Sequence, residues 1–391
     1  MLDRDKFPKL LDNKTILLTG AGGGIGIEAA LAFAAMGARV ILAELDPDKG
    51  KQAQDAIARA YPQNPAVLYT VDLADEAQVR AMAARILAHE GVPDVVFNNA
   101  TITKMGAVDE VDASFWDRSY AVNLKAPLLL SQLFLPQMKA RNSGVLVFVS
   151  SSGASPYMGA YEVFKTAQVE LANTLAMELD GTGVFAYTVG PGLVKTQTAM
   201  NAIEIVSKQM GMSIESFYEM NSNHILEASA AGLGFALSAA NAGRYHGQEI
   251  GCIQVLMDNG LFDGESAEST TTSVSAEQGA LFARILDTFA NQYAGWQRMN
   301  LFERQWVLRD FKKSMGISTD QAQENLQRMA EAISGGTAVS QKDRNMLDSL
   351  RQYWEHQLKL LRGYEKNPAK LDENVRIIEG WIDDIVRFLG D

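Results

Sequence analysis

The stretch AYEVFKTAQVEL (160–171) sets a tyrosine and a lysine four residues apart, Tyr161 and Lys165. On a helix, side chains at this spacing share a face, so a phenol and an ammonium would lie side by side. Such a pair could move protons in catalysis. Because both residue types are common, the same spacing also fits an ordinary solvated helix face. Other parts of the chain have to decide between these interpretations.

A glycine-rich turn follows the first predicted strand. The apolar run TILLTG (15–20) leads into AGGGIG (21–26), and a helix is predicted over 25–37. Glycines let the backbone approach a ligand closely, and the helix N-terminus offers free N–H groups and a positive dipole end to a pyrophosphate. Between the first strand and the first helix of a βαβ unit, this turn predicts a dinucleotide site.

Two acidic residues end the next two predicted strands. Glu44 is placed to accept hydrogen bonds from an adenosine ribose, and its charge would repel a 2′-phosphate. The segment 45–47 supplies no arginine or lysine, and Asp46 adds negative charge. The sequence therefore favours NAD over NADP, unless Glu44 is only a solvated strand end. Asp72 is placed to reach the adenine, although acidic residues commonly end strands.

Short apolar runs alternate with amphipathic helical stretches, which predicts βαβ units and a parallel, doubly wound (Rossmann-type) sheet buried on both faces. The predicted strands are 15–20, 38–45, 66–73, 93–100, 144–151, 183–192 and, as the last of the series, CIQVLMD (252–258).

The composition changes after the last predicted strand. We expect a nucleotide-binding domain over 1–262, a linker rich in Ser, Thr and Glu over 263–278, and an all-helical extension over 279–391. Two capping pairs, Ser318 with Gln321 and Ser340 with Asp343, predict helix starts in the extension. An apolar stripe at steps of three and four predicts its last helix: Leu371, Val375, Ile378, Ile382, Ile385 and Leu389. The extension could cover the active site, form an oligomer interface or bind another protein.

Composition narrows the function classes. The 391 residues carry a net charge of −12 with a pI near 5.0, which argues against nucleic acid or anionic membranes as partners. Cys252 is the only cysteine and the four histidines are scattered, so no disulfide or metal site is expected. The charged N-terminus lacks a signal-peptide core and no apolar run is long enough for a membrane span, so a cytoplasmic location is predicted.

Six matches in order make the chain resemble the short-chain dehydrogenase/reductase family over about residues 10–262. The glycine turn T-G-x-x-x-G-x-G is met by residues 19–26, and the strand-four motif N-N-A-G by Asn98-Asn99-Ala100-Thr101. Further matches are a helix asparagine, a serine at the end of strand five, Y-x-x-x-K and P-G-x-V-x-T: Asn123, the run Ser150-Ser151-Ser152, Tyr161 with Lys165, and 191–196. The resemblance favours the catalytic interpretation of Tyr161 and Lys165.

The resemblance implies a hydride transfer between nicotinamide and a secondary alcohol or ketone. Tyr161 would be the general acid/base, and the Lys165 charge would lower its pKa and bind the nicotinamide ribose. Ser151 would hydrogen-bond the substrate oxygen, and Asn123 would hold a water in a proton relay to Lys165. The implied cofactor contacts are Gly20, Gly24, Ile25, Gly26, Glu44, Asp72, Leu73, Asn99, Ala100, Tyr161, Lys165, Pro191, Gly192, Val194 and Thr196.

The sequence departs from the family pattern in three places. Thr101 stands where glycine is usual, Phe164 stands where a small serine is usual, and the interval from Ser151 to Tyr161 is short by a few residues. The short interval leaves the catalytic serine open among Ser150, Ser151 and Ser152, and Ser151 fits the usual strand-end register.

The substrate class and the assembly are less constrained. Four methionines in 197–231 fit a bulky or apolar substrate, and they fit plain helix packing equally well: Met200, Met210, Met212 and Met220. A homo-oligomer, dimer or tetramer, is expected. Two other functions stay open: a dinucleotide-binding regulatory or scaffolding protein that uses the helical tail, and an epimerase or dehydratase that retains NAD.

Overall fold

The computed structural model describes residues 4–151, 155–220, 225–261, 276–299, 319–335, 339–364 and 368–390, with scattered positions between 304 and 317. The chain divides into two compact units, Met1–Gly264 and Glu265–Asp391. Each unit is described by itself below.

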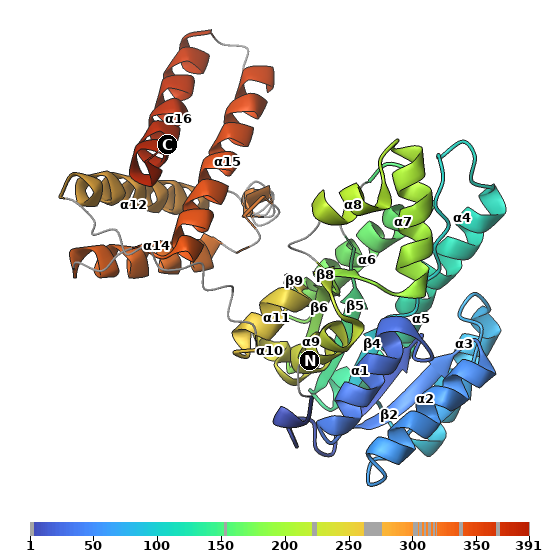
Figure 1. Cartoon of the computed structure of the whole chain (residues 1–391). Coiled ribbons are helices and arrows are strands. Elements are labelled where there is room, and N and C mark those ends of the chain that lie inside the picture. Colours follow the sequence, from blue (N-terminus) through green and yellow to red (C-terminus); the bar gives the residue numbers. More distant parts are fainter. Residues whose placement is uncertain are drawn as a thin grey trace. The chain divides into compact units, whose positions relative to one another are not determined.

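The first unit is built on a parallel sheet, which has seven strands among the described residues (Figure 1). The strand order is β3-β2-β1-β4-β5-β6-β9, and each pair of neighbouring strands is parallel. The strands are β1 (Thr15–Thr19), β2 (Arg39–Glu44), β3 (Val67–Thr70), β4 (Val95–Asn98), β5 (Gly144–Val149), β6 (Val184–Gly190) and β9 (Glu249–Gly251). This arrangement confirms the predicted doubly wound fold.

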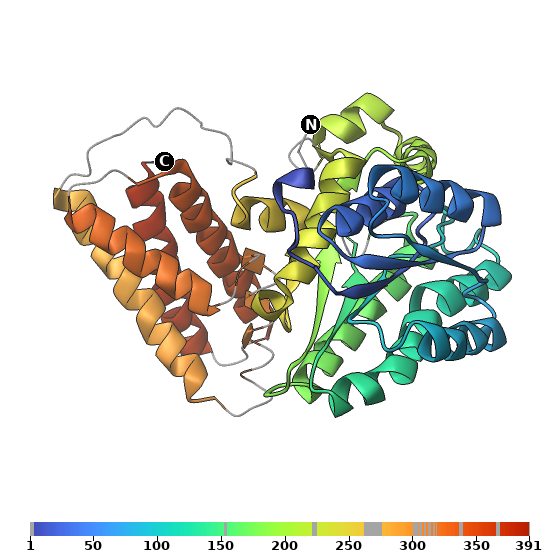
Figure 2. The ribbon, with the colours of Figure 1, turned by 90° about the horizontal axis from the view of Figure 1, so that it is seen from below.

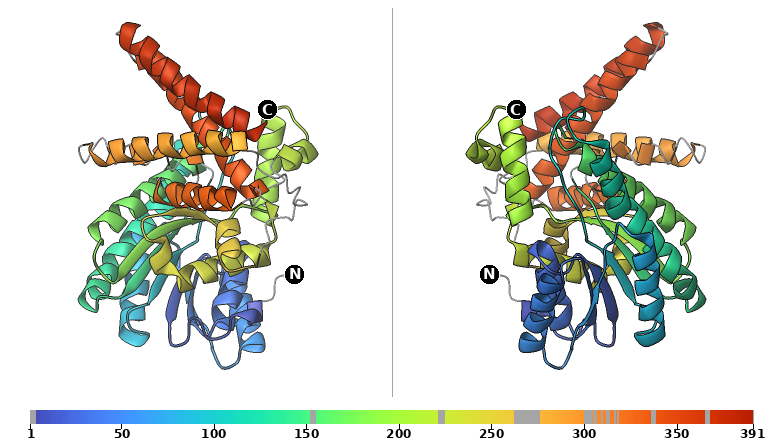
Figure 3. Two further views of the ribbon diagram at one scale, coloured as in Figure 1. Left: turned by 90° about the vertical axis from the view of Figure 1, so that its left-hand side faces the viewer. Right: turned by 90° about the vertical axis from the view of Figure 1, so that its right-hand side faces the viewer.

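Helices cover both faces of this sheet (Figure 3). One face packs against α1 (Gly24–Ala35), α2 (Pro47–Ala60), α9 (Ala228–Ala240), α10 (Ala242–Tyr245) and α11 (Cys252–Asp258). The other face packs against α3 (Glu76–His89), α5 (Ala126–Ala140) and α6 (Gly159–Glu178). Within β1, Ile16 and Leu18 belong to the first core and Leu17 to the second, so the strand needs apolar residues at every position.

The prediction for the last strand was wrong. The strand is Glu249–Gly251, and the predicted segment 252–258 is helix α11. Gly251 caps this helix, and its buried positions are Cys252, Val255 and Leu256. Spacings of three and four are those of a helix face, but a short apolar run does not distinguish a buried helix from a buried strand.

Shorter elements surround the carboxyl ends of the strands. They are α4 (Ala113–Tyr120), a π-helical turn η2 (Ala121–Lys125), β7 (Leu193–Val194), α7 (Gln197–Gln209), α8 (Ile214–Met220) and β8 (Ile225–Leu226). A 3-10 turn, η1 (Arg4–Lys6), lies near the N-terminus. β7 and β8 pair in parallel as a separate two-stranded sheet. No described helix is long and apolar enough to cross a membrane.

The second unit is helical in its described residues (Figure 2). It comprises α12 (Ala276–Gln297), α14 (Thr319–Ser334), α15 (Gln341–Tyr364) and α16 (Pro368–Leu389). These helices bury their own core, which includes Phe289, Phe311 and Trp354. Ile385 of the predicted stripe is fully buried in it, and Ile378 and Ile382 pack against it. The predicted helical extension is therefore confirmed as a set of helices beyond the sheet.

The two sequence signals at helix starts have different outcomes. The Ser340 hydroxyl accepts from the Asp343 N–H at 3.2 Å, as an N-terminal cap does, and donates to the Asp343 carboxylate at 2.6 Å. Ser318 lies outside the described residues, and so does the linker prediction except for 276–278, which begin α12.

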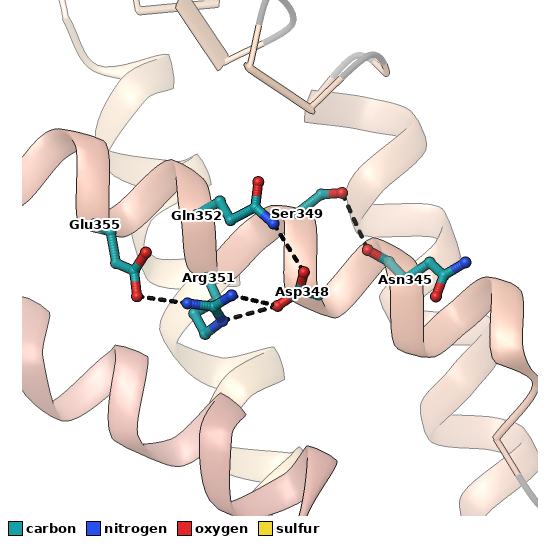
Figure 4. Close-up of polar contacts among 6 residues, drawn as sticks. All are labelled: Asn345, Asp348, Ser349, Arg351, Gln352 and Glu355. Carbon is teal, nitrogen blue, oxygen red and sulfur yellow. Dashed lines mark hydrogen bonds and ion pairs between the residues drawn. The ribbon is translucent and has the colours of Figure 1, made fainter. Parts of the chain in front are cut away.

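Several polar side chains in the middle of α15 pair with one another (Figure 4). Arg351 donates to Asp348 at 2.6 Å and to Glu355 at 2.6 Å, and Gln352 donates to Asp348 at 2.8 Å. The hydrogen bond that Arg351 donates to Asp348 raises the pKa of Arg351 above its usual value. Each of these contacts joins residues three or four positions apart, about one helical turn. Each therefore stabilises the helix itself, by about 0.3–0.5 kcal/mol.

One close helix contact fixes the position of α1, whose N-terminus begins at the glycine turn. A Cβ at Gly232 of α9 would lie 2.5 Å from the carbonyl carbon of Glu28 and 2.6 Å from the N atom of Ala29. We expect Gly232→Ala to separate the helices and to lower the free energy of unfolding by about 1–3 kcal/mol, measured by urea denaturation. Gly295→Ala in the interior of α12 is the control, because no atom lies within 4 Å of a Cβ placed there. Equal stabilities of the two variants would contradict this account.

Candidate active site

Hydrogen bonds hold the glycine turn against the end of β4. Asn99 donates its side-chain amide to the carbonyl oxygens of Thr19 and Gly20, each at 3.0 Å. The Thr19 hydroxyl accepts from the N–H groups of Asn99 at 3.1 Å and Ala100 at 3.0 Å. A Cβ at Gly20 would lie 2.7 Å from the Ala100 Cα. Asn99, Ala100 and Gly20 therefore shape the turn, and Thr19 is a residue in this role that sequence analysis did not single out.

The turn is also close to the start of α7. A Cβ at Gly26 would lie 2.0 Å from the Gly20 carbonyl oxygen, so only glycine fits there. Gly24 has φ +54°, and a Cβ on it would lie 3.2 Å from Thr196 Cγ2. Thr196 caps α7 by accepting from the Ala199 N–H at 3.2 Å. Two motifs more than 170 residues apart in the chain thus meet at one edge of the sheet, as the predicted dinucleotide site requires.

The remaining predicted cofactor residues lie on or beside these elements. Gly192 has φ +80°, in the short segment between β6 and β7 that Pro191 begins, and Val194 is buried in β7. Ile25 and Leu73 are partly buried against the two cores of the sheet.

Glu44 contacts the glycine turn directly. Its carboxylate accepts from the Gly22 N–H at 2.7 Å and from the N–H groups of Leu45 at 2.9 Å and Asp46 at 3.2 Å. A Cβ at Gly22 would lie 2.9 Å from Glu44 Cγ and 2.8 Å from Lys49 Cβ. Lys49 is an exposed cation beside the turn and pairs with Asp46 at 3.8 Å. It lies just beyond the segment 45–47 on which the predicted NAD preference depends.

Asp72 has partners for both carboxylate oxygens. One oxygen accepts from the Ala74 N–H at 2.9 Å, which forms a local turn, and the other accepts from Arg118 of α4 at 3.2 Å. Asp72 therefore also connects the loop after β3 to α4.

The catalytic candidates meet at the end of β5 and the start of α6. Ser150 is 2% exposed and donates its N–H to the Val189 carbonyl, so it belongs to the sheet. Ser151 is half-buried, lies within hydrogen-bond distance of the Tyr161 phenol and donates to Glu162 Oε1 at 2.6 Å. Ser152 lies outside the described residues. Of the two described serines, Ser151 is the one that contacts Tyr161.

Burial dominates the ionisation of the tyrosine and the lysine. It raises the pKa of Tyr161 to about 12, with the Ser151 hydrogen bond acting in the opposite direction. It lowers the pKa of Lys165 to about 8, while the charge of Glu162 acts to raise it. The sequence predicted a lowered pKa for Tyr161, but desolvation of the phenol outweighs the charges around it in this site.

The Lys165 ammonium is buried without a hydrogen bond. The side chain is 1% exposed, and its Nζ has no partner among the described residues. A buried ammonium left unpaired is costly, so its presence beside Tyr161 indicates a site built for hydroxyl or anionic ligand groups. Among the features of the site, the unpaired ammonium is the strongest sign that Lys165, together with the glycine turn, could bind a dinucleotide and its ribose.

Asn123 lies in the π-helical turn η2 and is fully buried. Its side-chain oxygen accepts from the Thr101 hydroxyl at 2.9 Å and from the Ile102 N–H at 3.0 Å. Its amide donates to the Ile102 carbonyl at 2.9 Å and to the Ser119 hydroxyl at 2.9 Å. Thr101, the departure after Asn-Asn-Ala, is thereby explained as an extra hydrogen bond to Asn123.

The main-chain carbonyl of Asn123 also has a side-chain partner. Pro127, four residues on, has no N–H with which to close the usual helical hydrogen bond. The buried Gln168 of α6 donates its side-chain amide to this carbonyl. Gln168 was not among the predicted site residues, although it is a polar residue three positions after Lys165 on the same helix, which is a usable signal.

Phe164, another departure, packs between two aromatic rings of α4. Its ring centroid lies 6.0 Å from that of Trp116 and 5.9 Å from that of Tyr120. Edge-on and tilted aromatic pairs of this kind bury area and hold α4 against α6. The larger side chain therefore has a packing role beside the catalytic pair.

The predicted substrate segment exposes several large apolar side chains among its polar ones. Met200 of α7 is 41% exposed and Met210 is 40% exposed, and Ile205 and Ile214 are similarly exposed. Lys195 lies over the Tyr218 ring at 4.8 Å. Among the described residues no cluster of His, Cys, Asp and Glu could hold a metal ion.

Comparison with known proteins decides the family. The short chain dehydrogenase family model matches residues 14–205. An uncharacterized oxidoreductase of Thermotoga maritima is 32% identical over 194 residues, which cover 49% of this chain and 76% of that protein. The chain belongs to the short-chain dehydrogenase family. It is an oxidoreductase of this family.

Two further relatives show how far the similarity extends. Meso-2,3-butanediol dehydrogenase of Serratia marcescens is 34% identical over 187 residues, which cover 47% of this chain and 73% of that protein. The structure of L-sorbose reductase from Gluconobacter frateurii, complexed with NADPH and L-sorbose, has a TM-score of 0.55 and 21% identity. It covers 62% of this chain and 95% of its own. This structure shows the shared fold, and the family match ends well before the helical unit.

The burial of Lys165 predicts a pH-dependent stability. Its pKa of about 8 lies below the ordinary 10.5, so the unfolded chain binds more protons between these pH values and stability rises with pH across that window. Below pH 8 the folded protein carries the full free-energy cost of burying the charged ammonium, on the order of 3 kcal/mol. We expect Lys165→Met to raise the Tm at pH 7, with a gain that shrinks towards pH 10.

The measurement is thermal unfolding of the first unit followed by circular dichroism at both pH values. Lys139→Met, which removes an exposed ammonium, is the control and should leave the Tm nearly unchanged. A lower Tm for Lys165→Met at pH 7 would show that the ammonium stabilises the fold and would contradict this prediction.

Proposed function

We propose that this protein is an NAD-dependent alcohol dehydrogenase or ketone reductase acting on a small secondary alcohol or its ketone. The observation that carries the proposal is the Lys165 ammonium, buried without a partner beside Tyr161 and Ser151. A regulatory dinucleotide-binding protein would not require a hydroxyl pair beside that ammonium. The butanediol dehydrogenase activity named for one relative supports the same substrate class.

The proposed roles follow from the chemistry of each side chain. Tyr161 gives or takes the proton at the substrate oxygen, and Ser151 holds that oxygen in place. The Lys165 ammonium binds the nicotinamide ribose through its free donors, and the glycine turn with the N-terminus of α1 binds the pyrophosphate. The cofactor, when bound, supplies the hydride acceptor or donor.

Removing the Tyr161 hydroxyl tests this proposal. We expect Tyr161→Phe to lower kcat by roughly 10²–10⁴-fold, the range for a general acid/base, and to leave NAD binding nearly unchanged. Turnover is followed by absorbance of reduced nicotinamide with a panel of secondary alcohols and ketones, and NAD binding by thermal shift. Retained turnover in Tyr161→Phe would overturn the mechanism. NAD binding without turnover of any panel member by the unaltered protein would favour the regulatory function.

We also propose NAD rather than NADP as the cofactor, because Glu44 presents a carboxylate at the glycine turn. Lys49 beside the same turn is the group that would favour a 2′-phosphate, and the L-sorbose reductase structure contains NADPH. The balance between Glu44 and Lys49 therefore decides the preference.

Two matched variants measure that balance. We expect Glu44→Gln to weaken NAD binding and to reduce the discrimination against NADP by about tenfold or more, since removing a charge contact costs at least ~1.4 kcal/mol. Lys49→Gln is expected to leave NAD binding nearly unchanged. The measurement is kcat/KM with each cofactor. An unchanged preference in Glu44→Gln, or a loss of NADP use in Lys49→Gln alone, would show that Glu44 only supports the turn.

Assembly, domain limits and location remain proposals from the sequence. We propose a homo-oligomer, which the exposed Val163 and Met177 of α6 support, since they are 52% and 55% exposed. We propose the catalytic unit over 1–262 and the separate helical extension over 279–391. The proposal of a cytoplasmic location rests on the single cysteine.

A further inference from the structure

Tyr161 lies at the least supported end of its helix. It is the third residue of α6 and so belongs to the first turn, where a helix has the fewest hydrogen bonds of its own. Among the described residues the N-cap of α6, Met158, makes no capping hydrogen bond with its side chain. Helix ends without such a cap fray. A proton-transferring phenol in this turn therefore needs an anchor from elsewhere in the fold.

A buried serine of another helix holds this turn. Ser119 of α4 is fully buried, and its hydroxyl donates to the main-chain carbonyl of Ala160 at 2.5 Å. Ala160 directly precedes Tyr161 in the chain. The Phe164 ring also packs on Trp116 of α4. Because a hydrogen bond constrains both distance and direction, the Ser119 contact fixes where the first turn of α6 lies against α4.

The direction of the Ser119 hydrogen bond follows from its neighbours. The Asn123 amide nitrogen donates to the Ser119 hydroxyl at 2.9 Å, and an amide nitrogen only donates. The orientation of this amide is determined by Ile102, whose N–H donates to the amide oxygen and whose carbonyl accepts from the amide nitrogen. The single proton of Ser119 is therefore directed to the Ala160 carbonyl.

These hydrogen bonds connect the predicted cofactor site to the tyrosine. They run from Ile102, in the loop after β4, through Asn123 and Ser119 to the residue before Tyr161. The same loop begins at Asn99, whose amide holds the glycine turn. Both linking side chains are fully buried and have partners for each of their polar atoms. A satisfied buried network is rigid, so the loop and the first turn of α6 are held at a fixed separation.

A second buried serine shows how Ser119 differs from a serine that only supports its own helix. Ser131 of α5 is 2% exposed, and its hydroxyl donates to the Pro127 carbonyl one turn earlier on the same helix at 2.8 Å. The partner of Ser119 lies on a different helix, next to the proposed acid/base. Removing the Ser131 hydroxyl alters one helix, whereas removing the Ser119 hydroxyl releases the turn that carries Tyr161.

We propose that Ser119 is a positioning residue for Tyr161, and that its hydroxyl keeps the phenol within reach of the substrate oxygen. The role rests on the proposed function, in which Tyr161 exchanges a proton with that oxygen. Proton transfer requires a separation of about 2.6–3.2 Å between the two oxygens, and a displacement of about 1 Å costs on the order of 10² in rate. Ser119 is fully buried, so it acts only through the main chain of α6.

The substitution Ser119→Ala in the full chain tests this role. With meso-2,3-butanediol and NAD as the probe pair, we expect kcat to fall by roughly 10–10²-fold while KM and the Kd for NAD change by less than about twofold. The binding groups keep their places, and only the phenol loses its anchor. Ser131→Ala is the matched control: it also removes a buried serine hydroxyl, and we expect it to leave kcat unchanged.

The pattern of the two variants distinguishes positioning from general support of the fold. A Ser119→Ala variant that loses thermal stability as Ser131→Ala does, yet keeps its kcat, would overturn the proposal. A fall in kcat matched by an equal weakening of NAD binding would overturn it too, because the whole site would then be distorted. Should Ser119→Ala not fold, Ser119→Cys keeps a side chain of similar size with a weaker donor and takes the same measurements.

The anchor can also be measured without turnover. Hydrogen–deuterium exchange of a peptide that covers 159–165 reports opening of the first turn of α6. We expect exchange there to become about tenfold faster in Ser119→Ala and to stay unchanged in Ser131→Ala. Unchanged exchange in Ser119→Ala would overturn the proposal. If the unaltered protein turns over none of the alcohols tested, the proposed substrate class fails, and the exchange measurement still decides whether Ser119 anchors the turn.

Discussion

The Lys165 ammonium is held at 1% exposure with no hydrogen bond to any described residue, and much of the site is arranged around that cost. A charge in this position is disfavoured enough for burial to lower its pKa to about 8. Glu162, three residues earlier, supplies the negative charge that acts against this shift. The fold accepts an unfavourable local arrangement where a ligand hydroxyl would complete it, and such arrangements are concentrated at functional sites.

The parallel sheet determines which motifs meet at this edge of the fold. Carboxyl ends of parallel strands lie at one edge, so the ends of β1, β4, β5 and β6 bring together motifs from distant parts of the chain. The Asn99 amide then fixes the glycine turn on the end of β4. Gly232 lets α9 approach α1 closely, which sets the direction of the helix whose N-terminus begins at that turn. The geometry of the site therefore depends on contacts in the core below it.

Local patterns were enough to predict the sheet and the positions of its motifs. Buried strands of four to seven residues and a glycine turn at a strand end are encoded within short segments. The strand prediction for 252–258 was wrong because this apolar run forms a partly buried helix. The helical spacing of its apolar residues can be recognised only once Gly251 is known to be the N-cap. The predicted sign of the Tyr161 pKa shift was wrong because the degree of burial is not encoded in the spacing of two residues.

Partners that depend on tertiary packing could not be predicted from the sequence. Nothing in the sequence around Glu162 indicates that it accepts from Ser151, eleven residues away across the short loop. The same holds for Gln168, whose partner is a carbonyl that Pro127 leaves without its helical donor. Each residue type was visible, and its hydrogen-bond partner was set by the packing of α6 against β5 and η2.

Thr101, which departs from the family pattern, and Gln168, which was not predicted, both bind oxygen atoms of Asn123. Asn123 has its side-chain oxygen bound by Thr101 and its main-chain oxygen bound by Gln168. Ser151 has its proton bound by Glu162. Tyr161, Lys165, Ser151 and Asn123 are thus all retained, while the polar groups around two of them have protein partners.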